Sequence, residues 1–247
     1  MSPWDFGRCV VFSPCALACA PGKIIVGQPK NYLYWKMKKY PILATLGLVA
    51  LVVPVLQADT VLFEQNFESL PAGPLPKEFL PLAGEFAVMT EGGAHFLQLP
   101  GSPLDTFGVL FGPSNGDSSS VEGRFQGTKQ GRKFPTFGLS LRGAGGYRLQ
   151  VSPGKGQLEI YKGDDPIAGV PFVWESGAWI CLKLRVKKMA AGWVVEGRAW
   201  KDGSEVPAEP QVKWDIVGEP PAGRAAIWGS PYSGTPISFD DLRWTAH

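Results

Sequence analysis

The sequence predicts an all-β fold over residues 59–247, an antiparallel sandwich of two β-sheets. Hydrophobic and polar side chains alternate with a period of two in several short segments, which is typical of strands with one buried and one solvated face. Glycine and proline clusters separate these segments at intervals of about 8–12 residues, as in other sandwiches. No segment after residue 59 keeps the 3.6-residue period of a helix over three turns. Helical bundles and parallel α/β folds are therefore excluded.

The turn residues between the alternating segments predict how the strands connect. Residues 143–146 (Gly-Ala-Gly-Gly) and 153–156 (Pro-Gly-Lys-Gly) join three segments into consecutive hairpins. Residues 187–192 join two further segments in the same way. The segments that we expect to form strands are 137–141, 147–151, 158–161, 180–186 and 193–199.

The stretch "MKKYPILATLGLVALVVPVLQADT", which begins at Met37, has the organisation of a secretory signal peptide. Lys38 and Lys39 precede an apolar run over residues 42–56, and the small Ala58 follows. The run is shorter than the roughly 20 residues that span a bilayer as a helix. We expect a signal peptide over residues 37–58 that is cleaved, leaving a secreted, periplasmic or cell-envelope protein without membrane attachment. The alternative is an uncleaved N-terminal anchor.

Residues 1–36 show no sustained helical or strand period. A signal peptide works best at the very N-terminus, so we expect that translation begins at Met37 and that residues 1–36 reflect a wrongly assigned start or a disordered leader. The alternative is a leader whose cysteines bind a metal or carry a lipid; these are Cys9, Cys15 and Cys19.

Composition limits the partners of the domain at residues 59–247. Six of the 24 Lys and Arg residues and one of the 22 Asp and Glu residues precede Asp59, which leaves 18 bases and 21 acids. Nucleic acid as a partner has no electrostatic support from such a balance. Cys181 is the only cysteine after residue 58, so the domain has no intrachain disulfide and is held together by burial. Its length suffices for one core. The oligomeric state is left open.

Five motifs, in order, resemble those of a known superfamily. They are "LFEQNFESLPAGPLP", "GLSLRGAGGYRLQVSPGKGQLEIYKG", "SGAWICLKLRV", "GRAWKDGSE" and "GRAAIWGSPYSGTPISFDDLRW", which together span nearly all of residues 61–244. This set resembles the concanavalin A-like lectin/glucanase superfamily, in particular its laminin-G-like and 3-keto-disaccharide hydrolase-like domains. The resemblance implies a jelly-roll sandwich and a carbohydrate as ligand or substrate. It poorly specifies the activity, because one fold hosts many functions.

Catalytic residues cannot be assigned from the sequence. Glucan hydrolases similar to this superfamily carry E-x-D-x-x-E on one strand face, so that two carboxylates flank the scissile bond; this chain lacks that spacing. Glu64 and Glu68 would share a face only if the first strand continued. His95 is the sole histidine before the terminal one, too few for a zinc site, and is expected at a strand edge. A glycoside hydrolase acting on keto-disaccharides or related glycans is therefore the alternative function.

A structural Ca²⁺ ion is the one cofactor that the sequence suggests. Neighbouring residues on a regular strand point to opposite faces, so Asp240 and Asp241 would separate, one toward the core side. In similar sandwiches the first and last strands are adjacent, and acids there can ligate Ca²⁺ through oxygen. Glu64 or Glu68 could supply a further oxygen ligand to the ion, beside Asp240 and Asp241. The alternative is that the aspartate accepts backbone N–H bonds from the loop at residues 230–235.

Two polar strand faces are candidate ligand-binding surfaces. The first combines side chains of consecutive hairpin strands, and the second lies on the pair of strands at residues 180–200, on the same sheet or another. We expect a noncatalytic carbohydrate-recognition domain, with glycan as partner; a structural or adhesion module is a third possibility. The binding residues that we predict are Arg142, Arg148, Gln150, Glu159 and Tyr161 on the first face and Arg198 and Trp200 on the second. Each face could also be an ordinary solvated surface with cross-strand ion pairs.

Overall fold

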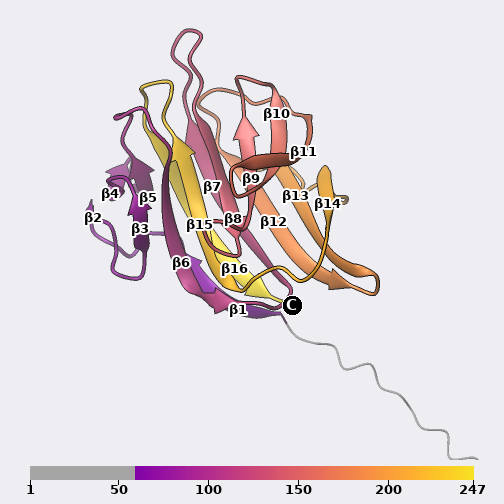
Figure 1. Ribbon diagram of the computed structural model, residues 1–247. Coiled ribbons are helices and arrows are strands. Elements are labelled where there is room, and N and C mark those ends of the chain that lie inside the picture. The colour runs from indigo at the N-terminus through magenta and orange to yellow at the C-terminus, as the bar shows by residue number, and fades with distance from the viewer. Residues whose placement is uncertain (1–58) are drawn as a thin grey trace, which may run out of the picture. The chain divides into compact units, whose positions relative to one another are not determined.

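Sixteen β-strands and no helix make up the part of the chain that the computed structural model describes, residues 59–247 (Figure 1). The predicted signal peptide and the leader before it lie outside these residues. Because the described part contains no helix, it also contains none that is long and apolar enough to cross a membrane.

The strands form two antiparallel sheets that pack face to face. The nine-stranded sheet has the order β14-β13-β12-β7-β16-β5-β4-β2, with β1 paired to β16. Its strands are β1 (Thr60–Gln65), β2 (Gly73–Pro74), β4 (Ala87–Glu91), β5 (Ala94–Leu99), β7 (Ser119–Gly127), β12 (Ile180–Met189), β13 (Gly192–Lys201), β14 (Val212–Ile216) and β16 (Ile237–Ala246).

The seven-stranded sheet has the order β11-β10-β9-β8-β15-β6-β3. Its strands are β3 (Leu80–Ala83), β6 (Phe107–Asn115), β8 (Thr136–Leu141), β9 (Tyr147–Ser152), β10 (Gln157–Lys162), β11 (Asp165–Pro171) and β15 (Gly223–Ser230). The hairpins β8–β9, β9–β10 and β12–β13 are those that the turn residues predicted.

Period-two alternation places the core between the sheets. Along β12, Ile180, Leu182 and Leu184 are buried, whereas the residues between them are partly exposed. Aromatic rings join the two layers: the Phe125 ring of β7 stacks on the Phe137 ring of β8 with centroids 5.9 Å apart. The two-sheet sandwich with a dry interior is therefore confirmed, and it leaves the outer face of each sheet to carry the polar side chains.

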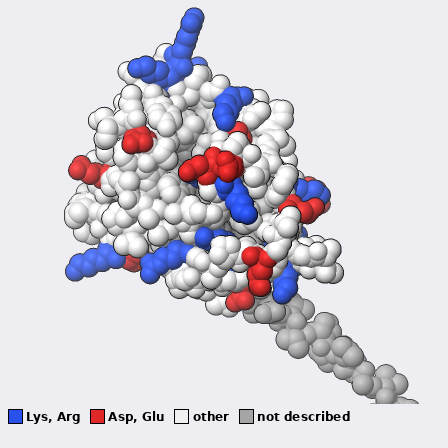
Figure 2. All heavy atoms as spheres, in the orientation of Figure 1, with Lys and Arg blue, Asp and Glu red and all other residues white. Residues whose placement is uncertain are grey.

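Charged side chains on the face that Figure 2 shows stand in small groups of both signs, with uncharged surface between them. The view contains no broad field of one charge. This face of the domain thus carries charges of both signs.

Candidate functional site

Strand register brings four of the predicted binding residues together on the outer face of the seven-stranded sheet. Arg148 of β9 lies opposite Tyr161 of β10, and Gln150 lies opposite Glu159 on the same two strands. Directly opposed residues of an antiparallel pair share a face, and residues two apart on a strand do as well. The row continues from Arg148 to Ser140 on β8. The hairpin reasoning therefore predicted this shared face correctly.

The guanidinium of Arg148 packs against two aromatic rings. Its central carbon lies 4.9 Å from the centroid of the Tyr161 ring and 5.4 Å from that of Trp228 on β15. Trp228 is itself fixed, because its indole N–H donates a 2.8 Å hydrogen bond to the Ser140 hydroxyl. Burial lowers the pKa of Arg148, although the side chain stays positively charged at neutral pH. The result is a cation fixed on the sheet face.

Glu159 forms a second fixed element next to this stack. The residue is only 4 % exposed, and its carboxylate accepts hydrogen bonds from the Ser152 and Tyr161 hydroxyls and the Lys155 ammonium, the latter two at 3.1 and 3.0 Å. Burial alone would raise the pKa of Glu159, but these three hydrogen bonds outweigh it and hold the pKa below its ordinary value. Glu159 is thus ionised, its charge is balanced by Lys155, and it supports the wall of the groove.

A groove of about 390 Å³ runs over these strands. Its floor comes from β8, β9 and β10, and its rim comes from loops that add aromatic and hydroxyl groups. On that rim the Thr106 hydroxyl bonds to the hydroxyls of Ser230 at 2.9 Å and Tyr232 at 3.2 Å. The lining residues are Thr106, Phe134, Thr136, Arg148, Gln150, Ser152, Gly154, Lys155, Tyr161, Ser230 and Tyr232.

The sequence reasoning missed several residues of this groove. Trp228 of β15 lies beside the lining, against Arg148, and no alternation signals it, because Ala225, Ala226 and Ile227 are buried in succession along that strand. Phe134 and Tyr232 lie in loops, outside any strand. Side chains there follow no period, so no sequence pattern signals that they line the groove.

Arg142 does not belong to this surface, which corrects its prediction as a binding residue. It follows the last residue of β8 and has a positive φ of 75°, so the side chain leaves the alternation of the strand. The guanidinium is buried and donates to the backbone carbonyls of Asn115 at 2.6 Å and Asp117 at 2.7 Å. Its role is to fix the loop between β6 and β7.

Arg198 and Trp200 lie on β13 in the other sheet, so the two predicted surfaces are on opposite layers of the sandwich. Arg198 donates to the carbonyls of Pro207 at 3.1 Å and Ala208 at 3.2 Å, and thereby holds the loop that follows β13. Trp200 pairs with Cys181 across the strands and is partly buried. Alternation shows which side chains face outward, but not which sheet they belong to.

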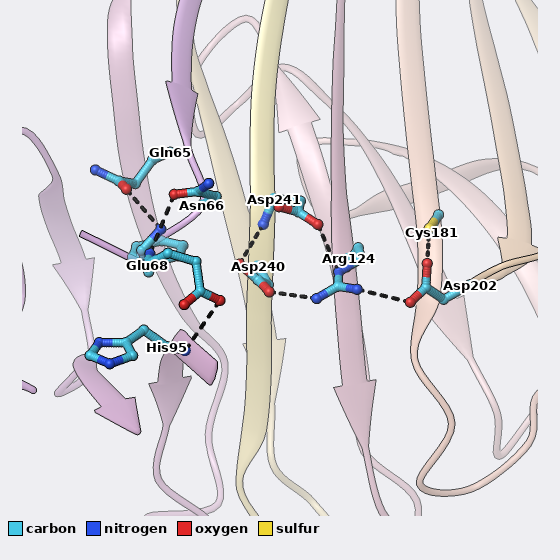
Figure 3. Close-up of polar contacts among 10 residues, drawn as sticks. Gln65, Asn66, Glu68, His95, Arg124, Cys181, Asp202, Asp240 and Asp241 are labelled. Atoms are coloured by element: carbon cyan, nitrogen blue, oxygen red, sulfur yellow. Dashed lines mark hydrogen bonds and ion pairs between the residues drawn. The ribbon is translucent and has the colours of Figure 1, made fainter. Parts of the chain in front are cut away.

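Asp240 and Asp241 point to the same side of β16, contrary to the prediction for a regular strand (Figure 3). The register between β16 and β7 shifts after Asp240, and Asp241 has a φ of 47°, as in a β-bulge. Both carboxylates consequently meet Arg124 of β7, at 2.6 Å from Asp240 and 2.9 Å from Asp241. Asp202 lies 2.9 Å from the same guanidinium.

The donor set predicted for Ca²⁺ does not fit that ion, because Arg124 takes the place of the cation. Burial raises the pKa of Asp240 although Arg124 lowers it, and the Asp240 carboxylate also accepts a 2.8 Å hydrogen bond from the Asp241 N–H. Glu64 faces Arg243 at 3.6 Å instead. Within residues 59–247 no three His, Cys, Asp or Glu side chains are placed to share a metal ion.

Cys181 and His95 each make a contact of a structural kind. Burial, followed by the nearby Asp202, raises the pKa of the Cys181 thiol to about 12, so the thiol stays protonated at neutral pH. The thiol donates to Asp202 at 3.6 Å. His95 Nδ1 lies 2.6 Å from the Leu70 carbonyl, and its ring points away from the aspartates (Figure 3). The Asp202 carboxylate, which the thiol faces, raises the pKa of Cys181 and so does not activate it.

Comparison with known proteins supports the fold. No protein-family model and no curated protein sequence matches the chain. Among solved structures, lectin I-B4 from Griffonia simplicifolia superposes with a TM-score of 0.51 at 11 % identity, covering 77 % of this chain and 99 % of the lectin. A xylan β-1,4-xylosidase from Bacillus halodurans gives 0.51 at 16 % identity, covering 73 % of this chain and 38 % of the xylosidase.

A GH43 protein from Bacillus licheniformis superposes with a TM-score of 0.52 at 11 % identity, over 74 % of this chain and 39 % of that protein. These similarities, with the two antiparallel sheets, show that residues 59–247 have a concanavalin A-like β-sandwich fold. At such low identity they carry information about the fold alone.

Proposed function

We propose that this protein binds carbohydrate in the groove on the outer face of the seven-stranded sheet. The observation that carries the proposal is the convergence of aromatic rings and hydrogen-bonding side chains on that groove. Tyr161, Tyr232 and Phe134 supply rings, and the Gln150 amide and the Thr136 hydroxyl supply polar contacts. Pockets that bind small polar molecules combine apolar walls with a few placed polar groups in this way.

The chemistry of sugars suits such a groove. A pyranose ring has an apolar face of C–H groups, which packs against aromatic rings, and a rim of hydroxyls, which needs donors and acceptors. Phe134 and Tyr232 stand at the rim, where they can cover a sugar, and Gln150 on the floor offers both a donor and an acceptor. Most of these groups are already fixed by strand pairing, so little ordering is required on binding.

The structural neighbours agree with this proposal. One of them is a lectin, and the other two are a xylosidase and a GH43 protein. The fold is therefore one in which binders and hydrolases of carbohydrate are found, and the site must decide between them.

We propose binding rather than hydrolysis on the basis of the carboxylates. Glycosidases place two carboxyl groups across the scissile bond, and one of them must be protonated to act as an acid. No carboxylate is among the residues that line the groove. Glu159 lies beneath its wall, but three hydrogen bonds and a lowered pKa keep it ionised. We further propose, from the segment at residues 37–58, that the domain acts after export.

The test is a glycan array followed by calorimetry with the wild type and two variants. Tyr232→Ala removes a ring that is 44 % exposed, and Gln150→Ala removes the amide from the floor. We expect each variant to weaken the best glycan roughly three- to tenfold, the range that an aromatic contact or a neutral hydrogen bond supports. Trp214→Ala is the matched control, because Trp214 is also 44 % exposed but lies on β14 of the other sheet.

Two results would overturn the proposal. One is that no glycan on the array binds, or that Trp214→Ala weakens binding while the two groove variants do not. The other is the release of product from keto-disaccharides or β-glucans incubated with the protein, because this would show hydrolysis.

A further inference from the structure

We propose that the groove prefers anionic glycans, and that Arg148 pairs with the carboxylate or sulfate group of the bound sugar. This inference rests on the proposed function and adds the chemical class of the ligand. It comes from one feature of the groove, a fixed guanidinium that has no anionic partner within residues 59–247.

Arg148 makes no side-chain hydrogen bond or ion pair among the described residues, a state that it shares with the partly buried Arg185 of β12 and Arg224 of β15, but of these three arginines only Arg148 lines the groove. The Nε–H of Arg148 is buried without an acceptor. In contrast, Arg142 and Arg198 each donate to two backbone carbonyls, and Arg124 meets three carboxylates. An uncompensated charged donor is costly, so a bound anion would relieve a cost that the free protein carries.

The carboxylates near Arg148 do not form an ion pair with it. Asp164 acts on the pKa of Arg148 through space, but it is exposed, in the turn between β10 and β11, and forms no ion pair with it. Glu159 is occupied by Lys155, whose ammonium lies 3.0 Å from it. The lining of the groove therefore carries two cations and no carboxylate, and Glu159 neutralises one of those cations from below. Arg148 is therefore the cation of the groove lining whose charge is not paired with a carboxylate of the described residues.

The geometry of Arg148 also suits an anion better than a neutral hydroxyl. The Tyr161 and Trp228 rings both pack against the guanidinium, whose N–H donors lie along its edge and are the groups that a ligand can reach. A carboxylate or sulfate has two oxygens spaced to accept from that edge together, and such bidentate pairs are strong and directional. Because the rings fix the side chain beforehand, its ordering cost on binding is small.

The test measures binding of three galactose-based oligomers of equal length by calorimetry. The oligomers are a galacturonate, its carboxyl-reduced neutral form and a sulfated galactan; the first and third separate carboxylate from sulfate as the anion. We expect the protein to bind at least one anionic oligomer about tenfold or more tightly than the neutral one, a difference that one charge-assisted pair supports. Raising the salt concentration should weaken the anionic oligomers only.

Two variants assign the preference to Arg148. Arg148→Gln removes the charge, and we expect it to reduce the anionic-to-neutral affinity ratio to near one. Arg148→Lys keeps the charge without the planar fork, and should retain part of the ratio. Arg243→Gln is the matched control, since Arg243 is an exposed arginine on β16 of the other sheet, and it should leave the ratio unchanged.

The outcomes separate this inference from the proposed function. Equal affinity of the wild type for neutral and anionic oligomers, with loss of both on Tyr232→Ala, would overturn the preference and leave carbohydrate binding in place. An anionic preference that persists in Arg148→Gln would also overturn the inference, by assigning the preference to another residue. Absence of binding to all oligomers and to the glycan array would remove the proposed function itself. The salt dependence needs no variant, so a misfolded Arg148→Gln protein leaves the preference testable.

Discussion

Arginine side chains in this sandwich take different roles according to the acceptors around them. Arg124 lies among three aspartates, Arg142 ties down a loop through backbone carbonyls, and Arg148 lies between aromatic rings with its donors free. The residue type alone predicts none of these roles. What distinguishes them is the backbone near each residue and the partners contributed by distant strands, which are set by tertiary pairing.

Arg124→Leu should destabilise the fold by about 3 kcal/mol, since it leaves a buried carboxylate without its cation. The Asp240 side chain is only 5 % exposed, whereas Arg243, which faces the exposed Glu64, offers a control. Arg243→Leu should change the free energy of unfolding by less than about 0.5 kcal/mol. Urea unfolding at pH 7 measures both. Equal effects of the two variants would show that the Arg124 cluster is an ordinary surface network.

Glu159 predicts a pH dependence of stability with a definite sign. Its hydrogen bonds overcome burial and lower its pKa below the ordinary value of 4.5, so the folded state binds fewer protons than the unfolded state in that region. Its contribution is therefore complete above that pH and is lost as the pH falls through the lowered folded-state pKa. Glu159→Gln cannot titrate, so its destabilisation relative to the wild type should shrink between about pH 5 and pH 3.

Urea unfolding across that pH range checks the Glu159 prediction, with Glu64→Gln as the control, because Glu64 is exposed and faces only Arg243. The control should show a small difference at every pH. A gap between the wild type and Glu159→Gln that stays constant down to pH 3 would contradict the assigned hydrogen bonds.

At the scale of the elements, alternation predicted the strands well wherever they are regular. The hairpins β8–β9–β10 and the pair β12–β13 follow the sequence pattern, and their inward residues are buried. The failures occur where the backbone departs from extended geometry. Arg142 has a positive φ at the end of β8, and Asp241 has one in the bulge of β16. Each departure redirects a side chain, and period-two reasoning cannot anticipate it.

The bulge in β16 predicts how substitutions of Asp241 rank. Its φ of 47° is tolerated by asparagine but is costly for a β-branched residue. Asp241→Asn loses only a half-exposed ion pair and should cost less than about 1 kcal/mol. Asp241→Val should cost about 1–2 kcal/mol more, from left-handed backbone strain. Thermal and urea unfolding compare the two variants; equal stability would mean that β16 has no bulge at this residue.

For the whole molecule, the sandwich could be predicted from the sequence because many strand residues lie either on the buried face of a sheet or on its solvent-exposed face. The Phe125 ring illustrates the buried side, because its centroid lies 5.5 Å from that of Phe239 in the same sheet and 5.9 Å from that of Phe137 in the other layer. Which sheet each solvent-exposed face belongs to could not be predicted from the sequence. That depends on strand order, and β7 and β16 are neighbours although over a hundred residues separate them.

For the same reason, the floor of the groove could be predicted from the sequence but its rim could not. Its floor residues Arg148, Gln150 and Tyr161 belong to consecutive hairpin strands, whose register follows from short turns. Its rim residues Phe134 and Tyr232 come from loops beside β8 and β15, two strands of the same sheet that are far apart in the sequence but pair with each other. A function assigned to the groove therefore depends on the pairing of β8 with β15, since an isolated β8–β9–β10 segment would present the floor without Tyr232.

The most direct test of the account is to map glycan binding by NMR chemical-shift changes on the labelled protein, using the best-binding oligomer from the array. We expect the shifted backbone amides to cluster on β8, β9, β10 and β15 and on the loops that carry Phe134 and Tyr232, while the outer face of β12, β13 and β14 stays unchanged. Shifts confined to the nine-stranded sheet, around Arg198 and Trp200 or around Arg124, would contradict it.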